Sequence, residues 1–520
     1  MKLPMDMAVE VYTGNLDVQL NHQELCENKR TEHRTSRITH SAMSRNTLAG
    51  FIHSILSYLF QLRNHSWPWS TAQSESYVKA KSPLPAPIAF QNVSLGKGSA
   101  SEHLDRNAEY WWDSSGYALS VLLERAGYTD HAQHKLLDFF LTVIPSLGPR
   151  LSSTSPPRWK SFMTDNHVPI ELSWDWRTDG EPPKIRFSIE PVGVHAGTHL
   201  DPRNQYASAQ LRETVARVLP NTDMEWLDHF QSQLNGKAVK DMAETVEGHM
   251  SKEFYAFDLN GNGSIMAKAY FFPGFKARAT EKSNFDIIRS TISTAPGCSP
   301  DKLEALACFQ SYVRDPSTPH LEMDMLAIDL VGPVESRFKI YFRIRDTSFA
   351  SIRNTMTLGG RVQTPEIDQG LGDLRRLYCT LVGAGQGQRQ MQMIDENVHT
   401  QDKDHRTAGI LYNVEFKYGS RSPKVKVYLP VRHFALSEEG IISTLDEHFQ
   451  QTQRSCSWRT NMRNYREALR TVFSADTLRA HDGLQTYLGC SVKGRAGLRL
   501  VSYINPGASQ GTGGCGCGEP

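Results

Sequence analysis

Three short segments of the chain place a lysine two residues before a tyrosine, and a fourth repeats the pattern more loosely. The segments are Lys268–Pro273, Arg337–Tyr341, Lys424–Pro430 and Leu500–Pro506, the last with Lys493 some way before it. Side chains along a β-strand alternate between two faces, so each lysine shares a face with its tyrosine, while the other face is apolar. The apolar face must pack against another layer, so the cationic face needs a separate enclosure. A sheet closed into a barrel, with the cationic face lining its lumen, meets both requirements.

The four tyrosines of these segments are spaced 71, 87 and 75 residues apart along the chain, at Tyr270, Tyr341, Tyr428 and Tyr503. This spacing indicates a weak internal repeat with a period near one ααββ unit. Apolar periodicity predicts helices at 131–143, 207–218, 223–234, 301–313, 370–382, 438–451 and 464–473. It predicts strands at 185–189, 264–272, 338–343, 409–417, 424–430 and 498–503. The alternation indicates an α/β protein built from ααββ units.

Composition divides the chain into three parts. Residues 1–105 are polar with short apolar patches, which predicts an N-terminal extension that is partly disordered. Residues 106–508 carry the alternating pattern without an obvious linker, which predicts one large domain. Residues 509–520 are rich in glycine and are predicted to form a flexible tail.

The overall charge and apolar content exclude several classes of partner. The net charge of +1 gives no reason to expect a nucleic acid partner. No apolar run reaches the roughly 18 residues of a membrane-spanning helix, so stable membrane insertion is not expected. The eight cysteines are scattered along the chain, which argues against a disulfide framework. A cytoplasmic location is predicted, because no signal peptide pattern opens the sequence.

The cations and tyrosines of the predicted lumen together suggest a chemistry. Buried lysines and arginines suit a multiply charged anion such as a diphosphate. An allylic diphosphate that ionises leaves a carbocation, which aromatic faces stabilise by about 0.5–2 kcal/mol each and shelter from water. The alternatives are a solvated strand face and a non-catalytic barrel that binds a polyanion. No Asp-Asp-x-x-Asp motif occurs, so no metal site and no cofactor are predicted.

A second candidate feature is Glu171, which lies among apolar residues in the stretch Thr164–Trp174. A carboxylate in such surroundings could accept a hydrogen bond from an indole N–H and raise the electron density of the ring as a ring carbon attacks. Taken alone, the residue is more simply interpreted as a glutamate at a helix end or in a salt bridge.

Several short motifs around these features resemble the fungal aromatic prenyltransferases of the dimethylallyl tryptophan synthase type. They are Tyr110–Trp112, Ala126–Tyr128, Leu147–Pro149, Pro169–Trp174 and Asp201–Asn204, in the order expected of that family. The likeness covers residues 108–506. It implies an ααββ (ABBA) barrel with antiparallel strands inside and helices outside. It also implies a metal-independent Friedel–Crafts transfer of a dimethylallyl group from its diphosphate to an indole-containing or related aromatic acceptor, in alkaloid secondary metabolism.

The resemblance also implies roles for individual residues. Glu171 is the expected acceptor of the indole N–H, with Phe162 and Met163 beside the aromatic substrate. The expected diphosphate ligands are Arg186, Lys268, Arg337, Lys339, Lys426 and Lys493. The expected tyrosine shield is Tyr270, Tyr341, Tyr428, Tyr487 and Tyr503. The expected partners are thus an aromatic small molecule and a prenyl diphosphate, with a homodimer left open.

Two positions depart from the family pattern. Lys426 stands where the family often has a glutamine, and Asp324 stands near the place where members acting on free tryptophan have an arginine for its carboxylate. The second departure disfavours free tryptophan and favours a cyclic dipeptide, an indole diterpenoid or another tricyclic aromatic acceptor. A phenol or xanthone acceptor is the alternative within the same chemistry.

Overall fold

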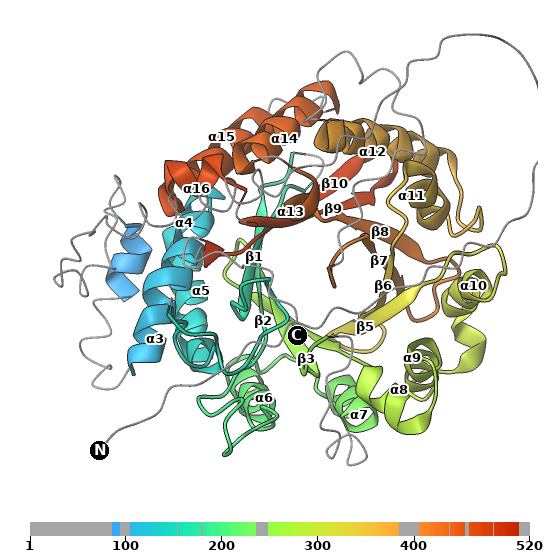
Figure 1. Cartoon of the computed structure of the whole chain (residues 1–520), viewed down its shortest axis with the longest axis horizontal. Helices are drawn as coiled ribbons and strands as arrows, with labels where there is room; N and C mark the ends of the chain where they lie inside the picture. The colour runs from blue at the N-terminus through green and yellow to red at the C-terminus, as the bar shows by residue number, and fades with distance from the viewer. Residues whose placement is uncertain are drawn as a thin grey trace, which may run out of the picture. The chain divides into compact units, whose positions relative to one another are not determined.

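The computed structural model describes residues 86–93, 105–152, 154–177, 180–235, 248–383, 405–435, 437–452, 457–481 and 483–508. The predicted tail at 509–520 and most of the predicted extension at 1–105 lie outside these residues. The main feature of the described part is a closed β-barrel surrounded by helices (Figure 1).

Ten antiparallel strands form the barrel. They are β1 (Ile170–Asp175), β2 (Lys184–Ile189), β3 (Glu253–Leu259), β4 (Ile265–Phe271), β5 (Glu322–Asp329), β6 (Arg337–Ile344), β7 (Ile410–Lys417), β8 (Lys424–Leu429), β9 (Gln485–Val492) and β10 (Leu498–Ile504). Each strand pairs with its neighbours in sequence, and β1 pairs with β10 to close the ring. The closure leaves no edge strand open and confirms the predicted antiparallel barrel.

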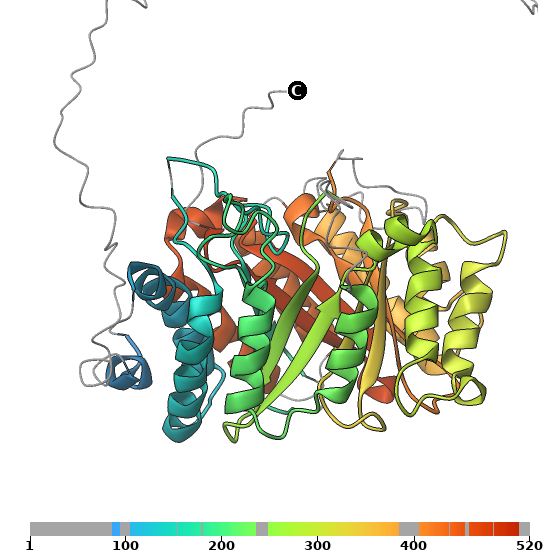
Figure 2. The ribbon, with the colours of Figure 1, turned by 90° about the horizontal axis from the view of Figure 1, so that it is seen from below.

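Helices cover the outside of the barrel, in groups of two to four that precede successive strand hairpins. They are α3 (Arg106–Trp111), α4 (Tyr117–Arg125), α5 (Asp130–Val143), α6 (Ala207–Val218), α7 (Glu225–Leu234), α8 (Gly274–Thr280), α9 (Asn284–Ser293), α10 (Glu304–Val313), α11 (Phe349–Met356), α12 (Pro365–Gly383), α13 (Val431–Phe434), α14 (Glu438–Thr452), α15 (Ser457–Val472) and α16 (Ala475–Arg479). Seen from the side, the helices run alongside the strands (Figure 2). None of the described helices is both long and apolar enough to cross a membrane.

Strand β6 shows how the sequence pattern becomes a barrel wall. On its outer face, Phe338 stacks on Trp226 of α7 with the ring centroids 4.7 Å apart. Further along, Phe342 contacts Phe309 of α10 with the centroids 5.4 Å apart. The alternate residues of β6 therefore point into the lumen, as the period of two requires. The apolar face is buried against helices, and the cationic and aromatic face is enclosed by the other strands.

Some elements were not predicted from sequence. All six predicted strands have counterparts, but β1, β3, β5 and β9 are additional. All seven residues of β3 are buried, so its apolar residues do not alternate with polar ones and a period of two is not visible. The prediction for α10 began too early, because a separate 3₁₀ turn occupies Pro300–Lys302 before the helix starts at Glu304.

Part of the predicted N-terminal extension packs on the helical layer. Residues 86–93 include a short helix whose Phe90 ring stacks on Trp112, with centroids 4.7 Å apart and planes 7° from parallel. The neighbouring Trp111 is buried, and its Nε1 donates a hydrogen bond to the Gly148 carbonyl oxygen at 2.9 Å. The stacking of Phe90 on Trp112 attaches a short segment of the predicted extension to the domain that follows it.

Candidate active site

Two cavities in the barrel interior share a layer of four tyrosines, Tyr270, Tyr341, Tyr428 and Tyr503. The cationic chamber is lined by eight lysines and arginines: Arg186, Lys268, Arg337, Lys339, Lys424, Lys426, Lys493 and Arg499. The aromatic chamber lies on the other side of the tyrosine layer and is lined by Phe162, Met163, Glu171, Phe254, Met325 and Tyr487, among others. The barrel thus brings a cluster of positive charge and an apolar cavity into contact across four phenol rings.

All fourteen residues predicted for the site line these chambers. The six predicted diphosphate ligands lie in the cationic chamber, four of the five predicted shield tyrosines line both cavities, and the remaining four residues line the aromatic chamber. The common location follows from the closed sheet, because inward positions of distant strands meet in one lumen. The individual roles of these residues stay predictions.

Two carboxylates that lie between the cations were not predicted from the sequence. Asp258 on β3 forms ion pairs with Arg186 and with Lys268, the latter at 2.5 Å. Asp329 on β5 accepts hydrogen bonds from Arg337 at 2.5 Å and from Lys339 at 2.6 Å. Burial alone would raise the pKa of Asp258, but the two cations hold that pKa well below its usual range. Asp258 is the last inward residue of β3.

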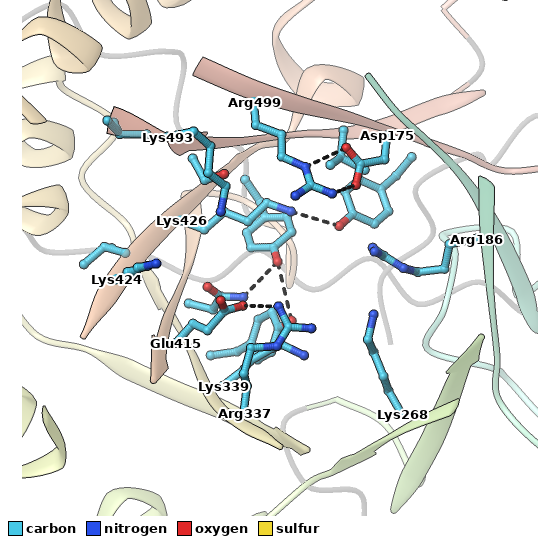
Figure 3. A pocket seen from close by; sticks show the side chains of 18 of the residues that line it. Asp175, Arg186, Lys268, Arg337, Lys339, Glu415, Lys424, Lys426, Lys493 and Arg499 are labelled. Carbon is cyan, nitrogen blue, oxygen red and sulfur yellow. Dashed lines mark hydrogen bonds and ion pairs between the residues drawn. The ribbon is translucent and has the colours of Figure 1, made fainter. Parts of the chain in front are cut away.

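The carboxylates neutralise only part of the cationic chamber. Asp175 pairs with Arg499, and Glu415 accepts from Arg337 at 3.3 Å (Figure 3). Together with Asp258 and Asp329 these are four carboxylates against eight cations. Among the described residues, Lys424, Lys426 and Lys493 form no ion pair. The chamber therefore keeps a net positive charge, which suits an anion with several charges.

Lys426 lies directly against the tyrosine layer. Its Nζ lies 4.4 Å from the ring centroid of Tyr428 and 5.5 Å from that of Tyr503, and it donates to the Tyr503 hydroxyl at 3.3 Å. A Cβ at Gly489 would lie 2.8 Å from this Nζ, so the glycine of β9 makes room for the lysine of β8. Burial, and then the nearby Arg186, lower the pKa of Lys426 to about 7. Lys426 is therefore a half-buried base whose protonated form an incoming anion would favour.

The tyrosine layer is continuous across the barrel. The centroids of Tyr341 lie 5.9 Å from those of both Tyr270 and Tyr428, and the Tyr428 and Tyr503 centroids are 5.8 Å apart. Asn413 donates to the Tyr428 hydroxyl at 2.9 Å, which holds that ring in place. Several aromatic faces around one small volume form a surface that stabilises an organic cation.

Glu171 lies on β1 with its side chain in the aromatic chamber, so the interpretation as a helix-end residue is wrong. Its Oε1 accepts a hydrogen bond from the Thr486 hydroxyl at 2.6 Å. Burial raises its pKa to about 7, against the lowering effects of that hydrogen bond and of Arg432. The carboxylate is thus close to half ionised at neutral pH, and an N–H or O–H donor in the chamber would favour the ionised form.

A buried glutamate that was not predicted, Glu190, positions Phe162. Glu190 accepts hydrogen bonds from the Ser161 hydroxyl at 2.6 Å, from the Trp159 Nε1 at 2.8 Å and from the Phe162 backbone N–H at 3.2 Å. The Ser251 hydroxyl donates to the same carboxylate at 2.6 Å. Four donors on one carboxylate fix the loop that places Phe162 against Phe254, with centroids 5.0 Å apart.

Other charged residues of the aromatic chamber were also missed. They are Asp324 on β5, Arg343 on β6, and Arg406 and Arg432, which lie outside the strands. Asp324 was considered only as the place of a missing arginine. Arg343 continues the inward alternation of β6 two residues after Tyr341, so the period of two could have marked it. Arg406 and Arg432 come from segments without a family motif, so no local signal marks them.

One group of residues that could hold a metal ion was not foreseen. Asp165, His405 and His433 bring three ligand atoms within 4.8 Å of one another. Thr407 links the two histidines, because its hydroxyl lies 2.7 Å from Nδ1 of His405 and 3.0 Å from Nε2 of His433. No spacing in the sequence indicates this group, because its members lie far apart along the chain. None of the three lines the cationic chamber.

Comparison with known proteins agrees with this geometry. Residues 107–468 match the family model described as tryptophan dimethylallyltransferase. The 4-O-dimethylallyl-L-tyrosine synthase of Claviceps purpurea is 32% identical over 422 residues, which cover 79% of this chain and 92% of that protein. The 7-dimethylallyltryptophan synthase of Aspergillus fumigatus is 30% identical over 459 residues, which cover 84% of this chain and 90% of that protein.

Solved structures show the same architecture. The structure of NotF in complex with brevianamide F and DMSPP aligns with a TM-score of 0.66 at 25% identity, covering 81% of this chain and 99% of that one. The structure of AnaPT from Neosartorya fischeri aligns with a TM-score of 0.67 at 23% identity, covering 81% of this chain and 98% of that one, and so supports the fold. The closed barrel, the two chambers and the sequence match lead to one conclusion: the chain belongs to the tryptophan dimethylallyltransferase family of aromatic prenyltransferases.

Proposed function

We propose that the protein transfers a dimethylallyl group from dimethylallyl diphosphate to a ring of an indole-containing or related aromatic acceptor, without a metal ion. The observation that carries this proposal is the shared tyrosine layer, which separates a chamber with net positive charge from an aromatic chamber that contains Glu171. A diphosphate held on one side places its allyl group among the tyrosines, and an aromatic ring held on the other side meets it there.

The reaction follows from this arrangement. The C–O bond of the donor breaks, and its electron pair leaves with the diphosphate, whose charge is stabilised by the lysines and arginines. The allyl cation lies among the tyrosine faces, which stabilise it and exclude water. A ring carbon of the acceptor forms the new C–C bond, and the ring then loses its proton. Because the chamber cations supply the charge neutralisation, the step needs no metal ion.

Glu171 orients and activates the acceptor. Its carboxylate accepts a hydrogen bond from the ring N–H of an indole and so raises the electron density of the ring in the transition state. A phenolic hydroxyl could make the same contact. The named activities of relatives include both kinds of ring, since they act on tyrosine, tryptophan and, in Emericella nidulans, a xanthone. The proposed setting is secondary metabolism in the cytoplasm. The proposal is compatible with a monomer and with a homodimer.

Turnover of dimethylallyl diphosphate with a panel of indoles and phenols in EDTA tests the proposal. Prenylated product is expected, identified by mass and by its NMR spectrum. Tight binding of the donor without product from any acceptor would indicate a polyanion-binding barrel instead.

Two substitutions test the roles of the two chambers separately. Lys268→Met should weaken donor binding by about 10- to 100-fold, because a charge-assisted phosphate contact is worth about 1.5–3 kcal/mol. Glu171→Gln should lower kcat for an indole acceptor while the donor Kd stays unchanged. Lys417→Met is the matched control, because Lys417 is an exposed β7 cation paired with Glu335 outside the chamber. Equal effects of Lys268→Met and Lys417→Met on the donor Kd would contradict the assignment.

A further inference from the structure

Three segments in the wall of the aromatic chamber also carry the group of possible metal ligands. The group consists of Asp165, His405 and His433, and each stands within two residues of a side chain that lines the chamber. Those neighbours are Met163, Arg406 and Arg432. Asp165 and His405 are exposed, and His433 is half-buried. This part of the chamber wall therefore reaches the protein surface, and the three ligand residues lie there together.

The types of ligand in this group favour a transition-metal dication. Two imidazoles and one carboxylate each offer a ligand atom, and the three atoms lie within 4.8 Å of one another. Zn²⁺ binds such atoms at about 2.0–2.2 Å, so tetrahedral ligands stand about 3.4 Å apart. Rotation of the exposed Asp165 and His405 side chains can close that difference. Mg²⁺ and Ca²⁺ prefer sites made of oxygen atoms alone, so Zn²⁺ fits this group better.

Neighbouring side chains hold each of the three ligand residues. The hydroxyl of the buried Thr407 lies 2.7 Å from Nδ1 of His405 and 3.0 Å from Nε2 of His433, and the two rings have centroids 5.3 Å apart. Nε of Arg432 lies 3.2 Å from Oδ2 of Asp165. Oδ1 of the same carboxylate is the oxygen that an ion would take. Partners of this kind orient metal ligands and strengthen metal binding.

The charges around the group set a limit on the affinity. Arg432 is paired with Asp165, and Arg406 donates to the Phe162 carbonyl oxygen at 3.2 Å. Their positive charges oppose a dication. Three protein ligands beside two arginines should therefore bind Zn²⁺ more weakly than a structural site with four ligands.

We infer that Asp165, His405 and His433 bind one Zn²⁺ ion, with the fourth position open to water as in other sites with three protein ligands. The ion links the loop before β1, the segment before β7 and the helix α13 across the wall of the aromatic chamber. None of the three ligands lines either chamber. The proposed prenyl transfer does not use the ion, so its effect is on the chamber wall.

Zn²⁺ at this position should weaken acceptor binding and leave donor binding unchanged. The ion fixes the loop that places Phe162 and Met163 in the chamber, and it adds positive charge beside Arg406 and Arg432. A ring that enters the chamber then meets a more rigid wall. The donor cations lie on the other side of the tyrosine layer, away from the ion.

Calorimetry with ZnCl₂ tests the site without turnover. The full-length protein is treated with EDTA, dialysed and titrated. One equivalent should bind at the assigned site and raise the unfolding temperature, because the ligands come together only in the folded state. Each of Asp165→Asn, His405→Gln and His433→Gln should weaken this binding at least about tenfold, since even the loss of a group that only orients a ligand costs that much.

His199→Gln is the matched control, because His199 is an exposed histidine outside the group. The assigned ion is the one that the three ligand variants lose and the control retains. Equal unfolding temperatures in EDTA show that the variants are folded. Wild-type protein that binds no Zn²⁺, or three ligand variants that bind it as tightly as wild type, would overturn the inference. Neither result bears on prenyl transfer, which is measured in EDTA.

Equilibrium dialysis of 3-methylindole tests the effect on the acceptor chamber. The donor is left out, because its diphosphate would itself bind Zn²⁺. The Kd of wild-type protein for 3-methylindole should be at least about fivefold higher in ZnCl₂ than in EDTA, the lower end of usual coupling between two sites. His405→Gln should give the same Kd in both. A wild-type Kd that does not change when the ion is bound would contradict an action on the acceptor chamber.

Discussion

Glu171 and Lys426 are half-buried ionisable residues on opposite sides of the tyrosine layer, and both have a pKa of about 7. Burial disfavours the charged form of each side chain, so it raises the pKa of the acid and lowers that of the base. The sequence places both residues in the site, but their protonation depends on the enclosure by distant strands. Each is poised to change its charge when a substrate arrives.

The rate with an indole acceptor should depend on the ionisation of Glu171. Because its pKa is raised to about 7, the carboxyl group is protonated below that pH and cannot accept the N–H bond. At saturating donor, the acceptor kcat/KM should rise up to about tenfold per pH unit below pH 7 and level off above it. Glu171→Gln should remove this rise of kcat/KM with pH and lower the constant value reached above pH 7. If the variant showed the same rise, the titration would belong to another group.

Donor binding should be coupled to proton uptake by Lys426. Above pH 7 this lysine is mostly neutral in the free protein, and a bound diphosphate raises its pKa by favouring the ammonium form. Calorimetry at pH 7 in two buffers of different ionisation enthalpy should show uptake of about half a proton per donor. Lys426→Gln should abolish the uptake, whereas Lys424→Gln, at an exposed position two residues earlier, should retain it. Uptake that persists without Lys426 would point to another base.

At the scale of elements, close packing of helices on the barrel wall fixes the inward residues. The helix α12 begins with Pro365 and has Glu366 and Asp368 in its first turn, which are favourable N-terminal residues. Its Gly370 lies against β9, so a Cβ there would lie 2.5 Å from Cγ2 of Val492. The glycine is therefore required by tertiary packing, although on its own it lowers helix propensity.

Two glycines of α12 should respond in opposite ways to alanine. Gly370→Ala should lower the free energy of unfolding by about 1–3 kcal/mol, because the stiff Val492 side chain must move. Gly372→Ala should raise it by about 0.5–1 kcal/mol, because this exposed position has open space and alanine favours the helix. Denaturant unfolding of the two variants measures the difference. Equal effects would mean that α12 does not approach β9 closely.

At the scale of the described domain, the barrel holds net positive charge inside a closed sheet. That charge costs stability, because like charges repel in a chamber partly removed from water. An anion that binds only the folded state offsets this cost. The donor site and the stability of the barrel are therefore linked.

Inorganic diphosphate should stabilise the folded protein in EDTA. At a concentration about 100-fold above its Kd, the gain is about 2.7 kcal/mol, which appears as a higher unfolding temperature. Lys268→Met should need a higher diphosphate concentration for the same gain, and sulfate at equal ionic strength should give less stabilisation. No shift with diphosphate, or the same shift with sulfate, would exclude a specific diphosphate site.

Much of the architecture could be read from local patterns. Alternation around Tyr270, Tyr341 and Tyr428 identified their strands and the inward face, because a period of two is a local property of the backbone. Strands such as β3 were missed because both of their faces are buried, so their residues show no period. The family motifs located Glu171, which composition and spacing alone did not distinguish from a structural glutamate.

By itself, the sequence determined the ααββ order, the cations and tyrosines of the lumen, and the residues that meet there. Only the tertiary structure decided which carboxylates neutralise which cations, since Asp258 and Asp329 reach their partners through the register of neighbouring strands. It also decided that a bulge brings Asp324 into the aromatic chamber that Arg343 and Arg406 line. The reason is physical: the charge and pKa of a buried group depend on what lies across the cavity from it, and those neighbours come from segments far apart in the chain.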